Sequence, residues 1–216
     1  YIAAGLGAGS LASVAAYFLF SHVRTRVTVW KDPFAVYSNG GYQVAQSLFA
    51  IGTGGWFGLG LCQGLPDKIP VVTTDFIFSA IAEELGAVFA ICIILICVSC
   101  YIMFLNIAMQ IRDSFYKLVV LGLGTCYIFQ VFLAIGGVIK FIPSTGVTLP
   151  LVSYGGSSLL STLIMFAIIQ GLYILREDEE EIIERKKKEQ QIRQLRAERS
   201  RKQRTQEARK RAVKPE

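Results

Sequence analysis

Four apolar runs alternate along the chain with segments rich in glycine, proline and polar residues. The runs cover residues 2–21, 76–105, 118–139 and 159–175. Each run approaches the roughly 20 apolar residues that a helix needs to cross the hydrocarbon core of a bilayer. The pattern therefore predicts an all-α polytopic membrane protein, with four transmembrane helices in a membrane domain over residues 1–175.

A charged tail, residues 176–216, follows the last run. Hydrophobic residues make up 53% of the chain and the mean hydropathy is +0.48, which is too apolar for an ordinary soluble domain. The tail, by contrast, holds 15 Lys and Arg against 10 Asp and Glu, and so carries most of the net charge of +6. Glu181 with Arg185 and Glu184 with Lys188 have i, i+4 spacing, which predicts a charged helix near the membrane that frays farther out. Contact with anionic lipids or a cytosolic partner is a further hypothesis for the tail, whereas nucleic-acid binding is not expected.

Basic residues beside the last run indicate the orientation of the chain. The positive-inside rule places the tail in the cytoplasm, and the alternation of the runs then places residues 22–75 and 140–158 together on the outer face. Cations also occur in these outer loops, but long loops weigh little in that rule. The outer cations are Arg24, Arg26, Lys31, Lys68 and Lys140. The two loops are thus predicted to emerge on one face and to build one site.

The long outer loop has the composition of an ordered segment. It is rich in aromatic residues, and within residues 42–51 the polar residues Gln43, Gln46 and Ser47 recur on one helical face. That spacing predicts a short helix in the membrane interface, either as a simple anchor or with its two amides lining a wet groove. The glycine-rich residues 52–60 do not match a nucleotide-binding loop, since no Gly-Lys-Ser/Thr follows. We expect these glycines to allow close packing against membrane helices.

Three carboxylates lie at the start of the second run. Thr74 or Asp75 stands directly before the run, where a side-chain oxygen typically caps a helix N-terminus. A catalytic carboxylate at the same position is compatible with a cap, because a helix N-terminus favours the ionised form. Glu83 and Glu84 lie about 12 to 14 Å farther along the helix. Carboxylates at that depth are costly, which favours a structural role in which they pair with other parts of the protein.

Serines and glycines also precede the last run. Ser153 and Ser157 flank a Tyr-Gly-Gly segment where free backbone amides and hydroxyls gather. Helix capping is one interpretation of this pattern. The other is an anion pocket, because helix N-termini bind phosphate through the same donors, and Lys140 lies at the opposite end of this loop.

Several of these segments together resemble one family. Residues 143–158 read Pro-Ser-Thr-Gly-Val-Thr-Leu-Pro-Leu-Val-Ser-Tyr-Gly-Gly-Ser-Ser. They are similar to the signature of the SEDS proteins, the FtsW, RodA and SpoVE membrane glycosyltransferases of bacterial cell-wall synthesis. Residues 74–86 resemble the TDFIF and EELG element of that family, preceded by Gly-Tyr-Gln at residues 41–43 and Asp-Pro at residues 32–33. The resemblance covers about residues 1–175 and implies the last four of ten spans. The first six spans would then be missing, so we expect these 216 residues alone to be inactive.

The resemblance also implies an activity and its residues. Such a protein polymerises lipid II, a disaccharide-peptide on a polyprenyl pyrophosphate, into glycan strands at the outer face of the bacterial cytoplasmic membrane, in cell division or elongation. The family's presumed catalytic carboxylate corresponds to Asp75, which would act as a general base. The candidate substrate-binding residues are Gln43, Gln46, Lys68, Lys140, Ser153, Ser157, Arg24 and Arg26. No metal-ligand cluster or cofactor is evident in the sequence, although a divalent cation is possible. The implied partners are lipid II, a class B penicillin-binding protein and membrane lipids.

Two other functions stay open at this point. A lipid II flippase or transporter would depend on carboxylates deep in the membrane, Glu83 and Glu84, rather than on Asp75 near the surface. A non-catalytic scaffold that recruits a transpeptidase is the second alternative. Cys97 and Cys100 form a Cys-x-x-Cys pattern inside a span without a second pair, so we expect small buried residues there rather than a metal site.

Overall fold

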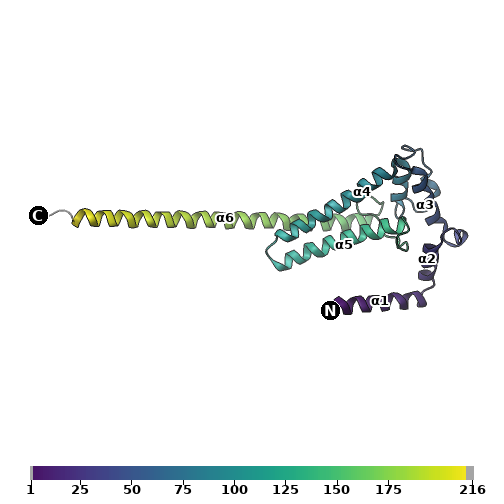
Figure 1. Ribbon diagram of the computed structural model, residues 1–216, viewed down its shortest axis with the longest axis horizontal. Helices are drawn as coiled ribbons and strands as arrows, with labels where there is room; N and C mark the ends of the chain where they lie inside the picture. The colour runs from purple at the N-terminus through teal and green to yellow at the C-terminus, as the bar shows by residue number, and fades with distance from the viewer. Residues whose placement is uncertain (1, 213–216) are drawn as a thin grey trace. The chain divides into compact units, whose positions relative to one another are not determined.

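The computed structural model describes residues 2–212, and all the regular secondary structure in that range is helical (Figure 1). The elements are α1 (Ile2–Leu19), α2 (Ser21–Lys31), the 3-10 helix η1 (Tyr37–Asn39), α3 (Tyr42–Gly54), the 3-10 helix η2 (Pro66–Lys68), α4 (Ile77–Gln110), α5 (Ser114–Val138) and α6 (Gly156–Ala212). The chain forms two compact units that divide after Ile169, within α6. The first unit holds both outer loops and all the candidate site residues.

Three helices of the described chain are long and apolar enough to cross a membrane. They are α4, α5 and residues 156–177 of α6. α1 is apolar as well, but it is shorter, and the chain leaves the helical conformation at Phe20. The fold is therefore an all-α polytopic membrane protein, as the hydrophobic pattern predicted, while the fourth span stays a prediction.

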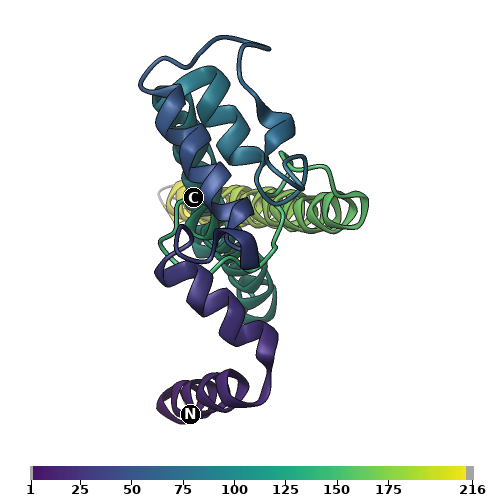
Figure 2. The same cartoon turned by 90° about the vertical axis from the view of Figure 1, so that its right-hand side faces the viewer.

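The spans pack through aromatic and small residues. Phe104 of α4, Tyr127 of α5 and Phe166 of α6 form a cluster of edge-to-face rings with centroids 5.1–5.6 Å apart. Gly124 lets α5 approach the ring of Phe104 closely, as small residues commonly do where membrane helices meet. α5 itself begins at a true cap, because Asp113 accepts a hydrogen bond from Phe115 N at 2.7 Å. The result is the side-by-side pair of α4 and α5 in Figures 1 and 2.

α4 is broken at Gly86, and the loop after α3 fills the break. Gly86 has φ 83° and ψ 172°, so the helical hydrogen bonds cannot continue across it. Four backbone hydrogen bonds of 2.9–3.2 Å replace them: Leu59 N to Glu83 O, Gly60 N to Glu84 O, Ala87 N to Gly55 O, and Val88 N to Trp56 O. A Cβ on Gly86 would lie 2.4–2.5 Å from the backbone of this loop. The glycine-rich residues 52–60 thus pack closely against a membrane helix, as predicted.

Residues 22–75 form more helix than the sequence pattern predicted. α2 was not foreseen, and it carries Arg24 and Arg26. α3 is the predicted short helix, but it packs against the start of α4 (Figure 2). Ser47 was expected on the polar face of this helix, with Gln43 and Gln46. It is instead fully buried, because its hydroxyl bonds that of Ser79 in α4.

The tail belongs to the second unit and is helical to Ala212. The two predicted ion pairs are present, with Glu181 to Arg185 at 3.3 Å and Glu184 to Lys188 at 3.8 Å. α6 continues without a break to Ala212, and fraying of its outer part stays a prediction. All four charged side chains of these pairs are exposed, so the pairs add little stability to the helix.

Candidate functional site

The two loops that are predicted to lie on the outer face, residues 22–75 and 140–158, meet, as the alternation of the runs predicted. Arg26 Nη1 donates to Ser144 O at 2.9 Å, and Trp30 Nε1 donates to Lys140 O at 3.1 Å. Farther along, Tyr154 N donates to Thr73 O at 2.8 Å. Each of these hydrogen bonds joins a residue of the first loop to a residue of the second.

A pocket of about 150 Å³ lies where the loops meet. Asp75, Arg26, Lys140 and Gln43 all line it. These four residues come from α2, α3, the segment before α4 and the turn after α5, so only the tertiary structure brings them together. One carboxylate, two cations and one amide therefore face a common space.

Asp75 does not cap α4, which corrects the capping interpretation. The N-cap is Phe76, and the helix has no side-chain cap hydrogen bond. Asp75 N and Thr74 Oγ1 both bond Val71 O, at 3.2 and 3.1 Å, in a turn that precedes the helix. Within the described residues the half-buried Asp75 carboxylate has no hydrogen bond or ion pair. Its oxygens are therefore available to a substrate.

Gly146 is the neighbour of Asp75 in the second loop. Its φ is +72°, which L side chains rarely adopt. A Cβ at this position would lie 3.3 Å from Asp75 Oδ2 and 3.9 Å from Arg26 Nη2. The glycine thus leaves room for the carboxylate and the guanidinium on either side of it.

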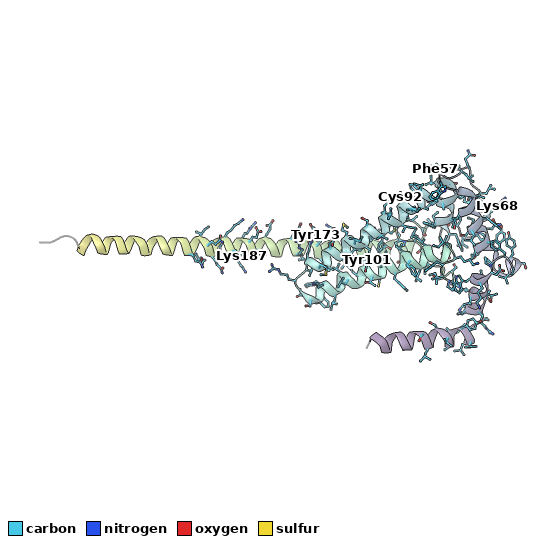
Figure 3. The ribbon with its side chains drawn as sticks, viewed as in Figure 1. Phe57, Lys68, Cys92, Tyr101, Tyr173 and Lys187 are labelled. Atoms are coloured by element: carbon cyan, nitrogen blue, oxygen red, sulfur yellow. The ribbon has the colours of Figure 1, made fainter. Side chains whose placement is uncertain are left out.

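Five of the predicted binding residues lie outside this pocket. Arg24 lines a separate surface hollow with Ser21 and Thr28. Gln46 donates to Tyr37 Oη at 2.8 Å, and Lys68 is an exposed residue of η2 (Figure 3).

The two serines of the second loop are also elsewhere. Ser153 Oγ accepts a hydrogen bond from Leu149 N at 2.8 Å, which ties it to its own loop. Ser157 is exposed in the first turn of α6, and its carbonyl oxygen accepts from Ser161 Oγ. A role for these five residues in binding stays a prediction.

Trp30 and Ser144 are pocket residues that the sequence pattern did not identify. Trp30 was counted only among the aromatic residues of an ordered loop. The sequence feature that could have identified Trp30 is its i, i+4 spacing from Arg26, because that spacing places both side chains on one face of α2. Both bond the backbone of the segment that leaves α5, and so hold α2 against the pocket.

Glu83 lies beneath the loop that fills the break in α4. It is 6% exposed, and its Oε1 accepts a hydrogen bond from Leu65 N at 3.3 Å. Its Oε2 has no hydrogen-bond partner in the described structure. Glu83 therefore contacts the loop of its own chain through one oxygen, and its expected pairing with the missing spans stays a prediction. Among the described residues, no three His, Cys, Asp or Glu side chains gather as a metal site would require.

Comparison with known proteins gives consistent matches. The family model for FtsW, RodA and SpoVE, described as cell cycle protein, matches residues 1–177. A peptidoglycan glycosyltransferase RodA of Mycobacterium tuberculosis is 46% identical over 169 residues, which are 78% of this chain and 36% of that relative. A probable peptidoglycan glycosyltransferase FtsW of Saccharophagus degradans is 39% identical over 163 residues, 72% of this chain and 42% of the relative. The chain thus spans well under half the length of these relatives.

A solved structure matches as well. It is a chain from a peptidoglycan synthase complex, in work on the structural coordination of polymerization and crosslinking. The sequence identity is 28% and the TM-score is 0.64, over 82% of this chain and 48% of that chain.

Proposed function

This chain belongs to the FtsW, RodA and SpoVE family, and from that premise we propose that it forms the catalytic part of a peptidoglycan glycosyltransferase. The substrate is lipid II, and the product is a glycan strand extended by one disaccharide per step. The observation that carries this proposal is the pocket in which Asp75, free of any capping role, faces Arg26, Lys140 and Gln43.

The chemistry of glycan extension matches these four side chains. A sugar hydroxyl must lose a proton as it attacks the anomeric carbon of the donor, and Asp75 can accept that proton as a general base. The diphosphate leaves without needing an acid, but its negative charge must be stabilised, which Arg26 and Lys140 can do. A divalent cation that arrives with the diphosphate could share this charge. Gln43 can bind a sugar hydroxyl through its amide.

The same proposal implies a location and an orientation for the protein. The spans lie in the bacterial cytoplasmic membrane, with residues 22–75 and 140–158 on the outer face and the tail in the cytoplasm. The reacting sugars of a lipid-linked substrate lie at headgroup depth, and Asp75, which precedes the first residue of α4 by two positions, is suited to reach them. A class B penicillin-binding protein is the proposed partner that crosslinks the strands.

The transporter alternative depended on carboxylates that line a path through the membrane. Glu83 is buried beneath the loop of residues 55–65 and bonds Leu65 N. This contact favours a role in holding that loop over a role in moving a proton or a lipid, so polymerisation is the function that we retain.

The experiment is polymerisation of labelled lipid II by the full-length protein in proteoliposomes, alone and with its class B partner. Wild-type protein should form long glycan strands. Asp75→Asn should accumulate normally and bind lipid II, yet polymerise it about 10² to 10⁴ times more slowly, because the base is lost.

Asp113→Asn is the matched control for this variant. Asp113 caps α5 outside the pocket, and Asn caps a helix about as well as Asp, so both rate and abundance should be kept. Near-normal polymerisation by Asp75→Asn would remove Asp75 from the mechanism. Failure of the wild-type protein to polymerise lipid II under any of these conditions would reject the proposed function.

A further inference from the structure

We propose that three polar side chains, Gln130, Thr148 and Ser158, form a cluster that positions Asp75 for the reaction. The inference rests on the proposed function, because it takes Asp75 to be the base. It assigns the serine-rich end of the second loop a role that differs from anion binding. The cluster touches neither the pocket nor the substrate, so its members are positioning residues.

The cluster joins three separate segments of the chain. Gln130 lies in α5, Thr148 in the second loop and Ser158 in the first turn of α6. Gln130 Nε2 donates to Thr148 O at 3.0 Å and to Ser158 Oγ at 3.3 Å, and Thr148 Oγ1 donates to Ser158 Oγ at 2.8 Å. The hydroxyl of Ser158 therefore accepts two hydrogen bonds, one from each of the other segments.

All three side chains are partly buried, where an unmade hydrogen bond is costly. The neighbouring residue Leu149 is only 3% exposed and anchors the loop in the core. Leu149 N donates to Ser153 Oγ at 2.8 Å, and Ser153 N returns a bond to Leu149 O at 3.0 Å. The cluster and this turn together fix the loop over residues 148–153.

The loop contacts the Asp75 segment on both sides of this fixed part. Before it, Gly146 lies beside the Asp75 carboxylate. After it, Tyr154 N donates to Thr73 O at 2.8 Å, two residues from Asp75. A loop that is held between two such contacts sets the place of Asp75 relative to the rest of the pocket. Ser158 thus influences the position of the Asp75 carboxylate indirectly, through the loop that its hydroxyl helps to hold.

A base works only when it is aligned with the reacting atoms. A displacement of about 1 Å from a distant substitution can lower a rate by about 10²-fold. Loss of the cluster should therefore lower kcat and leave KM almost unchanged, since Arg26 and the backbone of Lys140 make hydrogen bonds outside the cluster, to Ser144 O and from Trp30 Nε1. Direct binding of the substrate by Ser158 would raise KM instead.

The test uses the full-length protein and two matched pairs of variants. Ser158→Ala removes the shared acceptor, while Ser161→Ala removes an exposed hydroxyl of the same helix that bonds only Ser157 O. Thr148→Val removes one donor at nearly constant shape, and Thr148→Ser keeps it. We expect Ser158→Ala and Thr148→Val to lower kcat about tenfold or more, and Ser161→Ala and Thr148→Ser to stay near the wild-type value.

Hydrogen–deuterium exchange at the Tyr154 amide gives a readout that does not depend on activity. The bond from Tyr154 N to Thr73 O should open more often without the cluster, so exchange should be about tenfold faster in Ser158→Ala and Thr148→Val. The two control variants should exchange like the wild type. If Ser158→Ala does not fold, the comparison of Thr148→Val with Thr148→Ser tests whether the cluster positions Asp75.

The outcomes separate this inference from the function on which it rests. A wild-type kcat together with wild-type exchange in Ser158→Ala and Thr148→Val would overturn the inference, and so would a change confined to KM. Absence of polymerisation by the wild-type protein would reject the proposed function, and with it the positioning of a base. The exchange data would still show whether the cluster holds the loop.

Discussion

Lys140 lines the pocket at the point where α5 ends. Its φ is 61°, in the left-handed region that few non-glycine residues occupy. This conformation closes the helix, because Phe141 N donates to Gly136 O at 2.8 Å in a Schellman motif. Trp30 Nε1 adds a hydrogen bond of 3.1 Å to the Lys140 carbonyl oxygen. The backbone of Lys140 is thus fixed beside the pocket, where its charge can stabilise the diphosphate of the proposed reaction.

At the residue scale we therefore predict the effect of Lys140→Met. Methionine keeps most of the length of the side chain and the same backbone cost, so abundance in the membrane should be normal. Polymerisation of lipid II should fall by about 10²-fold, because one group that stabilises the leaving charge is lost. The measurement is the rate of strand formation from labelled lipid II, normalised to protein amount by immunoblot.

Lys117→Met serves as the control for this change. Lys117 lies near the start of α5, outside the pocket, and its replacement should leave the rate unchanged. A full rate in Lys140→Met would show that the diphosphate charge is stabilised elsewhere.

At the element scale, backbone hydrogen bonds at the break in α4 join the long outer loop to this membrane-spanning helix. The four backbone hydrogen bonds across Gly86 replace those that a continuous helix would make, so the carbonyl oxygens of Glu83 and Glu84 and the amides of Ala87 and Val88 keep partners. Glu83 reinforces the same junction from its buried position through Leu65 N. The helix segment that follows Asp75 is thereby held by the loop and by α3 together.

Gly86→Ala should disrupt this junction. The added Cβ meets loop backbone at 2.4–2.5 Å, and an alanine at φ 83° is strained in any case. We expect the free energy of unfolding to fall by more than about 1 kcal/mol. The decrease would be read as a lower Tm of the full-length protein in detergent.

Gly122→Ala is the counterpart on α5, where nothing lies within 4 Å of the added Cβ. A glycine to alanine change inside a helix is neutral or stabilising when there is space, so this Tm should stay the same or rise. Equal Tm values for Gly86→Ala and the wild type would show that the break is not needed.

At the scale of the whole molecule, the cysteines can test the orientation in the membrane. Cys62 is exposed in the outer loop, so it should react with a membrane-impermeant thiol reagent in intact cells whose outer membrane, where present, is permeabilised. Cys92 on α4 (Figure 3) and Cys126 on α5 are also exposed, but they lie on helices that are expected to cross the membrane, where lipid would surround them. They should stay unlabelled, as should Cys97 and Cys100.

A cysteine placed in the tail completes this test. Gln190→Cys should label only after lysis, because the tail is expected in the cytoplasm. Labelling of this cysteine in sealed cells would reverse the orientation and place the pocket on the cytoplasmic side.

The sequence determined the class of the molecule and most of the pocket chemistry. Long apolar runs must form helices in a membrane, since no other arrangement of one segment satisfies its own backbone. Asp75 was identified through the resemblance of residues 74–86 to a SEDS element, Arg26 and Lys140 as cations of the predicted outer loops, and Gln43 as an amide on a polar helical face. All four line the pocket.

Only the tertiary structure decided which of these polar residues share a site. Arg24 and Arg26 are two positions apart, yet only Arg26 lines the pocket, because residues two apart face different sides of α2. Asp75 looks like a cap in the sequence, but the turn at Val71 sets the helix start after it. The first outcome depends on a hydrogen bond between residues far apart in the chain, from Arg26 to Ser144, and local sequence does not show that partner. The second depends on a local turn, which the bond from Tyr154 N to Thr73 O joins to the second loop.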